Sequence, residues 1–216
     1  MNTVSTQAYR TFVSRAQQGI MLSEEAASLK EYCPFAPMPR LVAARGISAR
    51  GEKFFNPLVN GIRAEPSFIY YYQEGFTYEL TRWHGMAEYS AEAFLNRYAD
   101  KMGGDEGDVL YARVAWLMQC SGMFSDVMKE CRLSWNRVDK GFQVLERRYP
   151  DALSVKSAHA LLGGFGGGQA VARSLIEKLE GKVDGSVWQP LAQFKEHVRF
   201  AYAMKQPGQT ASNSKP

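Results

Sequence analysis

Apolar and polar residues follow the helical period over much of the chain, most clearly in residues 107–150. The second half of this stretch repeats apolar residues at steps of three and four: Val138, Phe142, Leu145 and Tyr149. The first half is denser in apolar residues: Val109, Leu110, Ala112, Val114, Ala115, Leu117 and Met118. Apolar residues with this period lie on one face of an α-helix. The pattern therefore predicts two amphipathic helices, joined by a connection over residues 121–133.

The N-terminal part of the chain has shorter amphipathic segments that end at helix breakers. Residues 6–18 carry apolar side chains on one side, which predicts a helix that ends at Gly19. Ser23 is a suitable N-cap for a second helix. The segment 34–39 then holds three prolines, which prevent a continuous helix. We expect residues 1–36 to form an N-terminal helix pair that caps the main body.

Two interpretations of this N-terminal pair remain open. As a cap, it packs an apolar stripe against the main body and shows a polar outer face to water. The stripe would contain Phe12, Val13, Leu22, Leu29 and Tyr32. In the competing interpretation, the pair docks onto a second chain and forms a dimer. The proline-rich break is short, which keeps the pair close to its own body and favours the cap. We expect a monomer or a weak homodimer.

The main body, residues 37–204, consists of further predicted helices separated by breakers. Pro57 and the turn signal Asn60–Gly61 limit residues 52–65 to one or two helical turns. The tyrosine-rich segment that begins at Pro66 favours a helix over a strand, because proline suits the first helical turn.

The glycine-rich and polar segments near the C-terminus predict a turn and a tail. The glycine run Gly163–Gly168 predicts a turn between two antiparallel helices. Residues 205–216 are rich in Ser, Pro, Gly and Gln and have nothing to bury, so we expect them to be a disordered tail.

Four positions of the predicted helices recur at an interval of 34 residues. Val138, Phe142, Leu145 and Pro150 are followed by Ala172, Ile176, Leu179 and Asp184. This interval resembles the tetratricopeptide repeat (TPR), whose second helix has small residues at similar spacing and ends at a proline. The segments RWHG, GDVLYARVAW and SW…GF…L…YP also resemble an uncharacterised bacterial family of such arrays. The resemblance covers residues 66–204 and implies an all-α fold of antiparallel helix pairs, stacked as a short TPR-like solenoid.

Composition and charge exclude several classes of protein. Apolar residues make up 45% and charged residues 22% of the chain, as in soluble globular proteins. The net charge of +4 is spread along the chain, so we expect no nucleic-acid partner. No apolar run approaches the roughly 18 residues of a membrane span, and the N-terminus does not look like a signal peptide. The cysteines Cys33, Cys120 and Cys131 include no close pair, which favours a reducing compartment and predicts a cytoplasmic protein.

Candidate catalytic and metal-binding motifs are incomplete. The glycine run lacks the Lys-Ser/Thr that follows in a P-loop. An acidic cluster around Asp105 does not have the ligand order of a calcium loop. The histidines His84, His159 and His197 fall on three separate predicted elements, without a metal-binding pair. We therefore expect neither a metal ion nor another cofactor.

Tyrosine and tryptophan residues on the predicted helices are the most suggestive candidates for a binding surface. Such residues are usually buried, but some can line the concave side of a helical array, where they anchor partners strongly. We expect a partner to contact Tyr71, Arg82, Trp83, His84, Tyr111, Arg113 and Trp116. The resulting hypothesis is a non-enzymatic scaffold or adaptor module that binds a protein or peptide.

An enzyme is the alternative hypothesis. His84 could serve a hydrolase or transferase if the stacking of helices brought it to the acidic residues Asp105 and Asp108. General acid–base catalysis requires that the imidazole reach a carboxylate directly or through one water molecule. The positions of these residues in the folded chain therefore bear directly on this alternative.

Overall fold

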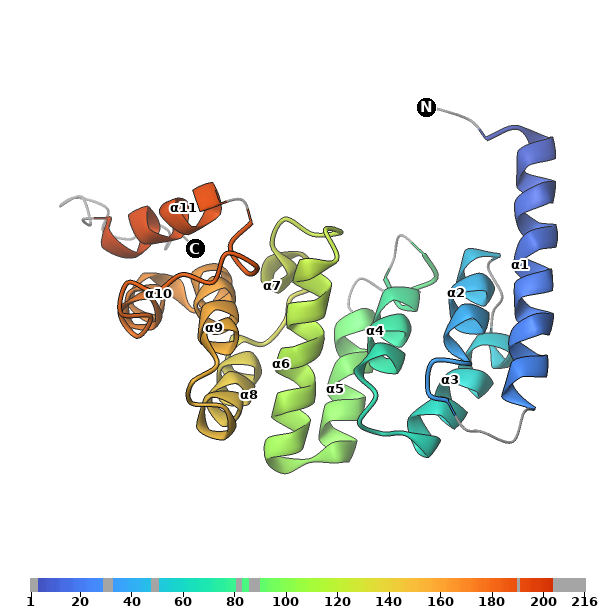
Figure 1. Ribbon diagram of the computed structural model, residues 1–216, viewed down its shortest axis with the longest axis horizontal. Coiled ribbons are helices and arrows are strands. Elements are labelled where there is room, and N and C mark those ends of the chain that lie inside the picture. The colour runs from blue at the N-terminus through green and yellow to red at the C-terminus, as the bar shows by residue number, and fades with distance from the viewer. Residues whose placement is uncertain are drawn as a thin grey trace, which may run out of the picture. The chain divides into compact units, whose positions relative to one another are not determined.

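The computed structural model describes residues 4–28, 33–47, 51–80, 83–85, 90–189 and 191–203 (Figure 1). This part of the chain contains eleven α-helices and no strand, which confirms the predicted all-α class. The chain divides into two compact units, which we call unit 1 (Met1–Leu133) and unit 2 (Ser134–Pro216). The expected boundary at residues 36/37 lies inside unit 1, and the expected tail, 205–216, lies outside the described residues.

Unit 1 holds the first seven of the described helices. They are α1 (Thr6–Ala27), α2 (Met38–Gly46), α3 (Glu52–Ala64), α4 (Ile69–Tyr78), α5 (Ser90–Met102), α6 (Gly104–Cys120) and α7 (Val127–Glu130). Unit 2 holds α8 (Trp135–Arg148), α9 (Leu153–Gly166), α10 (Gly168–Glu177) and α11 (Leu191–Tyr202). Within each unit, most helices pack against the next helix in the sequence. None of the helices that the structure describes has both the length and the apolar character needed to cross a membrane.

The N-terminal segment is one long helix up to Ala27, where the sequence predicted a first helix ending at Gly19. Glycine in a helix interior costs about 1 kcal/mol relative to alanine, which is too little to end a helix that packs along a neighbour. Helix α1 packs on α2 through a narrow stripe in which Val13, Ala16 and Ile20 are partly buried. Ser23, predicted to cap a second helix, lies inside α1, and its hydroxyl donates a hydrogen bond to the carbonyl oxygen of Ala36 at 2.6 Å.

Helix α3 is longer than the one or two turns predicted for its sequence. It has 13 residues and continues through Pro57. Its buried face contains Phe54, Leu58 and Ile62, and burying such side chains contributes about 1.5–3 kcal/mol each. That contribution exceeds the loss of about 3 kcal/mol caused by an internal proline. Gly61 is not a turn residue but a site of close approach, because a Cβ there would lie 2.6 Å from Cζ of Tyr71 on α4.

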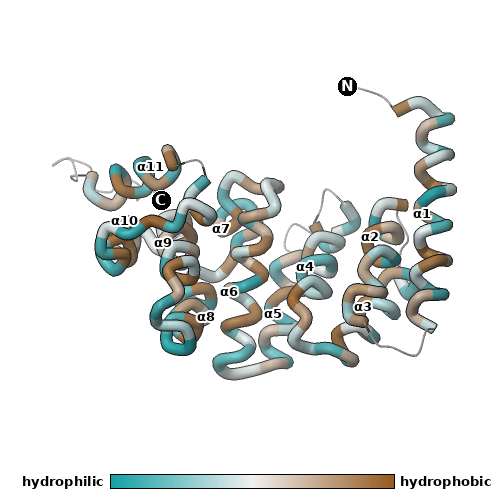
Figure 2. The backbone as a smooth tube through the Cα atoms, viewed as in Figure 1, coloured by the Kyte–Doolittle hydropathy of each residue, from teal (hydrophilic) through white to brown (hydrophobic). Residues whose placement is uncertain are grey.

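The core of unit 1 is built from aromatic side chains on closely packed helices. Its largest buried members include Phe54, Tyr71, Tyr72, Phe76 and Tyr111. Two glycines permit the close packing: a Cβ on Gly75 would lie 2.1 Å from the Phe94 ring, and one on Gly107 would lie 2.2 Å from the carbonyl oxygen of Ala99. Figure 2 shows apolar and hydrophilic segments alternating along the helices of this unit, as amphipathic helices require.

In unit 2 the turn predicted for the glycine run lies at Gly167 and Gly168, and the rest of the run belongs to a helix. Helix α9 continues to Gly166, and α10 begins at Gly168, whose φ of +77° provides the change of direction. The glycines inside α9 lack the side chains that would block its neighbours. A Cβ on Gly163 would lie 2.4 Å from Leu175 of α10, and one on Gly164 would lie 2.0 Å from His197 of α11. These tertiary contacts explain why so many glycines are helical here.

Candidate binding groove

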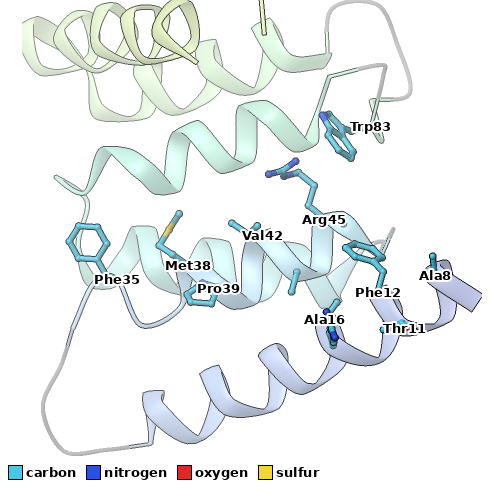
Figure 3. A pocket seen from close by; sticks show the side chains of 13 residues that line it. Ala8, Thr11, Phe12, Ala16, Phe35, Met38, Pro39, Val42, Arg45 and Trp83 are labelled. Carbon is cyan, nitrogen blue, oxygen red and sulfur yellow. The ribbon is translucent and has the colours of Figure 1, made fainter. Parts of the chain in front are cut away.

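A groove of about 1180 Å³ lies between α1 and α2 (Figure 3). Helix α1 lines it with Ala8, Thr11, Phe12, Arg15 and Ala16. Helix α2 lines it with Met38, Pro39, Val42, Ala43, Arg45 and Gly46. Phe35 lies at one end of the groove, and Trp83, from the turn after α4, lies towards the other. Most of these side chains are apolar, so the groove is a hydrophobic surface with a few polar groups.

Helical spacing explains why each wall is continuous. The lining residues of α1 follow steps of three and four, which places them on one face of the helix. The two walls differ in length, because α1 has 22 residues and α2 has 9, or about 33 Å against about 14 Å. Phe12 lies over Gly46, the last residue of α2, so the first turns of α1 continue past the end of α2. Consequently Tyr9 and Phe12 stay 54% and 45% exposed.

A polar cluster positions Trp83 beside the groove. Arg45 donates a hydrogen bond from Nε to Oε2 of Glu74 at 3.1 Å, and both side chains are mostly buried. The Arg45 guanidinium lies over the Trp83 ring, 4.8 Å from its centre. His84 Nε2 lies 3.0 Å from the carbonyl oxygen of Arg45. A carbonyl oxygen can only accept, so this ring nitrogen carries the hydrogen.

The charges that line the groove are positive. Arg45 is balanced by Glu74, but Arg15 has no ion-pair partner among the described residues. None of the described lining residues is acidic. Among the described residues, the groove therefore combines an apolar floor with one arginine, Arg15, that no acidic side chain pairs.

Among the seven residues expected to contact a partner, those that the structure describes do not form one surface. Trp83 lines the groove, with His84 in the cluster behind it. Arg82 lies outside the described residues. Arg113 is exposed and Trp116 partly buried on α6, and neither lines the groove. The sequence could not show which of these helix faces would be covered by neighbouring helices.

Tyr71 and Tyr111 belong to the core, which corrects their expected place on the binding surface. Both are 0% exposed, so they offer a partner no surface. Tyr71 lies against Gly61 of α3, and its hydroxyl donates a hydrogen bond to the carbonyl oxygen of Pro34 at 2.7 Å. A buried tyrosine needs such a partner, and here one is provided by the segment before α2.

Sequence reasoning missed most of the groove. Phe12 was expected to pack on the main body, and neither Val42 nor Met38 was considered. The sequence did contain one indication of the groove. The apolar stripe of the N-terminal segment is longer than the helical segment that follows the prolines, so part of the stripe has no neighbour to cover it. Reading α1 as two helices concealed that difference.

The enzyme hypothesis required His84 to meet the acidic residues of α6, and the structure does not bring them together. His84 follows the C-terminal end of α4, whereas Asp105 and Asp108 lie in the first turns of α6. Helix α5 lies between them in the chain and runs antiparallel to both α4 and α6 (Figure 1). The histidine and the two carboxylates therefore lie at opposite ends of these helices.

Unit 2 contains a buried histidine, His159, whose two carboxylate partners were not predicted from the sequence. His159 is 0% exposed, and its ring stacks on Phe142 with centres 5.0 Å apart. Nδ1 lies 2.6 Å from Oε1 of Glu146, and Nε2 lies 3.0 Å from Oδ1 of Asp139. Both ring nitrogens of His159 therefore face carboxylate oxygens, one on each side of the ring.

The carboxylates around His159 give this cluster a structural role. Burial alone would raise the pKa of Glu146, but the hydrogen bond from His159 and the charges of His159, Lys178 and Lys156 outweigh it and lower that pKa. Both nitrogens of His159 are engaged, so the ring has none with which to accept a proton from a substrate. The cluster is a buried ion network that ties α8 to α9.

Comparison of the chain with protein-family models, with curated proteins and with solved structures gives no match.

Proposed function

We propose that this protein is a non-enzymatic, TPR-like helical module that binds a protein partner in the groove between α1 and α2. The observation that carries the proposal is the exposure of apolar side chains in one groove. Phe12 and Val42 are each 45% exposed, Trp83 is 42% and Phe35 is 57% exposed. A contiguous exposed apolar surface with polar groups at its edge is typical of a protein-interaction site.

Burial at positions 34 residues apart in unit 2 supports the TPR-like part of the proposal. Val138 and Phe142 of α8 are buried, and their counterparts 34 residues later, Ala172 and Ile176 of α10, are buried as well. Equivalent positions in successive repeats pack against equivalent neighbours, so shared burial is what a repeat requires.

Affinity capture with groove variants tests the proposed function. Val42→Asp places a charge in the apolar groove at a partly exposed position, so the fold should persist while the surface is disrupted. Met21→Asp is the matched control, because Met21 is 68% exposed on α1 and does not line the groove. We expect a protein that is captured from the native cell lysate by the wild type and by Met21→Asp but not by Val42→Asp. Identical captured proteins for all three would contradict the proposal.

A further inference from the structure

The groove between α1 and α2 has a lining whose chemistry suits one helix. Its lining comes from two helices, with Phe12 and Ala16 on α1 and Met38 and Val42 on α2 (Figure 3). Helices pack at axial separations of about 8–10 Å by placing the side-chain ridges of one into the groove between others. Ala8 and Ala16 on α1 and Ala43 on α2 are small, which leaves room for the side chains of a third helix.

The lining of the groove is unsuited to an extended peptide. An extended segment has unpaired backbone N–H and C=O groups, which need partners when they leave water. Among the described lining residues the polar side chains are few: Thr11, whose hydroxyl donates to the carbonyl oxygen of Gln7 at 3.0 Å, and the two arginines, which only donate. They could not pair the N–H and C=O groups along a whole extended segment. A helix satisfies its own backbone hydrogen bonds and needs only apolar contacts.

The positive charge of Arg15 indicates which polar residues a bound helix would carry beside its apolar face. Arg15 lines the groove without an ion-pair partner among the described residues, whereas Arg45 is already paired with Glu74. A partner that places a carboxylate beside Arg15 gains a charge-assisted contact at the edge of an apolar interface. A partner with a lysine at that position would be repelled.

Resting on the proposed function, we infer that the partner is an amphipathic α-helix of another protein, with an apolar face and acidic residues that meet Arg15. The other available occupants fit less well. Residues 204–216 contain one large apolar residue, Met204, and two lysines. The α1 helix of a second copy carries Arg10 and Arg15 as well as Glu24 and Glu25, so it offers the groove no net negative charge.

Selection from a random library of displayed 16-residue peptides tests this inference. The library is selected on the wild-type protein after removal of every clone that binds Val42→Asp. We expect enriched peptides with apolar residues at steps of three and four, a net negative charge and no internal proline. Circular dichroism of a synthesised winner, with and without the protein, is expected to show helix formation on binding.

Charge exchange in one enriched peptide identifies the contact with Arg15. Fluorescence polarisation is expected to give a dissociation constant about tenfold weaker with Arg15→Glu than with the wild type. A peptide in which lysines replace the carboxylates is expected to prefer the Arg15→Glu variant. Arg10→Glu is the matched control, because it makes the same change on α1 outside the groove, and it should shift the constant by less than about twofold.

Each outcome of the selection and of the charge exchange either supports or contradicts the inference. Winners that bind in the groove but are not acidic, or whose affinity ignores Arg15→Glu, overturn the acidic helix and leave the proposed function standing. Absence of any clone that distinguishes the wild type from Val42→Asp overturns both. Light scattering that shows a dimer lost in Val42→Asp would identify the occupant as a second copy and also overturn the inference.

Discussion

Helices α1 and α4 are both amphipathic, but they use their apolar residues in opposite ways. Helix α4 buries seven of its ten residues, because α3 and α5 approach it closely at Gly61 and Gly75. Helix α1 buries only Ser23 among its 22 residues. Its one well-packed neighbour, α2, is less than half its length. An apolar stripe therefore becomes core or exposed surface according to the length and number of the helices beside it.

Truncation of an aromatic residue is expected to show the largest difference between the core of unit 1 and α1. Tyr111→Ala removes a fully buried ring and should lower the free energy of unfolding by about 3–5 kcal/mol. Phe12→Ala removes a ring that is 45% exposed and should cost less than about 1 kcal/mol. Urea unfolding followed by circular dichroism measures both. Equal losses for the two variants would show that α1 is part of the core.

Replacing a glycine by alanine is expected to destabilise the protein in the core of unit 1 and to stabilise it in α1. Gly75→Ala places a methyl group 2.1 Å from the Phe94 ring, and overpacking of this kind costs about 2–3 kcal/mol. A methyl group on Gly19 of α1 would meet nothing within 4 Å, so Gly19→Ala should stabilise the protein by about 0.5–1 kcal/mol. Thermal unfolding of the two variants would give shifts of opposite direction. Destabilisation by Gly19→Ala would mean that α1 is bent or closely covered at that position.

The buried cluster around His159 makes the stability of the protein depend on pH through Glu146. The pKa of Glu146 is lowered in the folded protein, so its contribution to stability is present above its ordinary pKa of about 4.3 and is lost as the pH falls below that value. We expect Glu146→Gln to cost about 1–2 kcal/mol at pH 7 and to weaken the loss of stability in acid.

Urea unfolding at pH 7 and at pH 4 measures the effect of Glu146→Gln. Glu25→Gln, an exposed carboxylate of α1, is the control and should leave both values within about 0.5 kcal/mol of the wild type. An unchanged acid dependence in Glu146→Gln would show that the ion network around His159 does not govern the acid stability of unit 2.

The smallest expected effect on stability belongs to the groove itself. Val42→Asp changes a side chain that is 45% exposed, and Met21→Asp one that is 68% exposed. Both should change the free energy of unfolding by less than about 0.5 kcal/mol. A loss of several kcal/mol in Val42→Asp alone would mean that this residue is structural and would remove it from the binding surface.

The periodicity of apolar residues predicted the helical class and most of the helices, because amphipathic helices are visible in local sequence. The errors at Gly19, Pro57 and residues 163–166 share one cause. At each of them a local helix breaker is overridden by tertiary packing: the stripe of α1 on α2, the buried face of α3, and the close approach of other helices to α9.

The candidate site was less accessible to sequence reasoning than the helices were. Trp83, predicted to contact a partner, lines the groove, but Tyr71 and Tyr111 are buried. Whether a tyrosine is core or surface depends on which helices cover it, and local periodicity does not contain that information. The groove arises from the unequal lengths of α1 and α2, which appear only once α1 is known to be continuous.

Photo-crosslinking in living cells tests the binding groove most directly. Benzoylphenylalanine is introduced at Val42, inside the groove, or at Met21, outside it on α1. We expect an adduct with another protein at position 42 and none at position 21, with the crosslinked peptide of that partner lying in an acidic amphipathic helix. The same adducts at both positions, an adduct with a second copy of this chain, or no adduct at position 42 would contradict a groove that binds a partner helix.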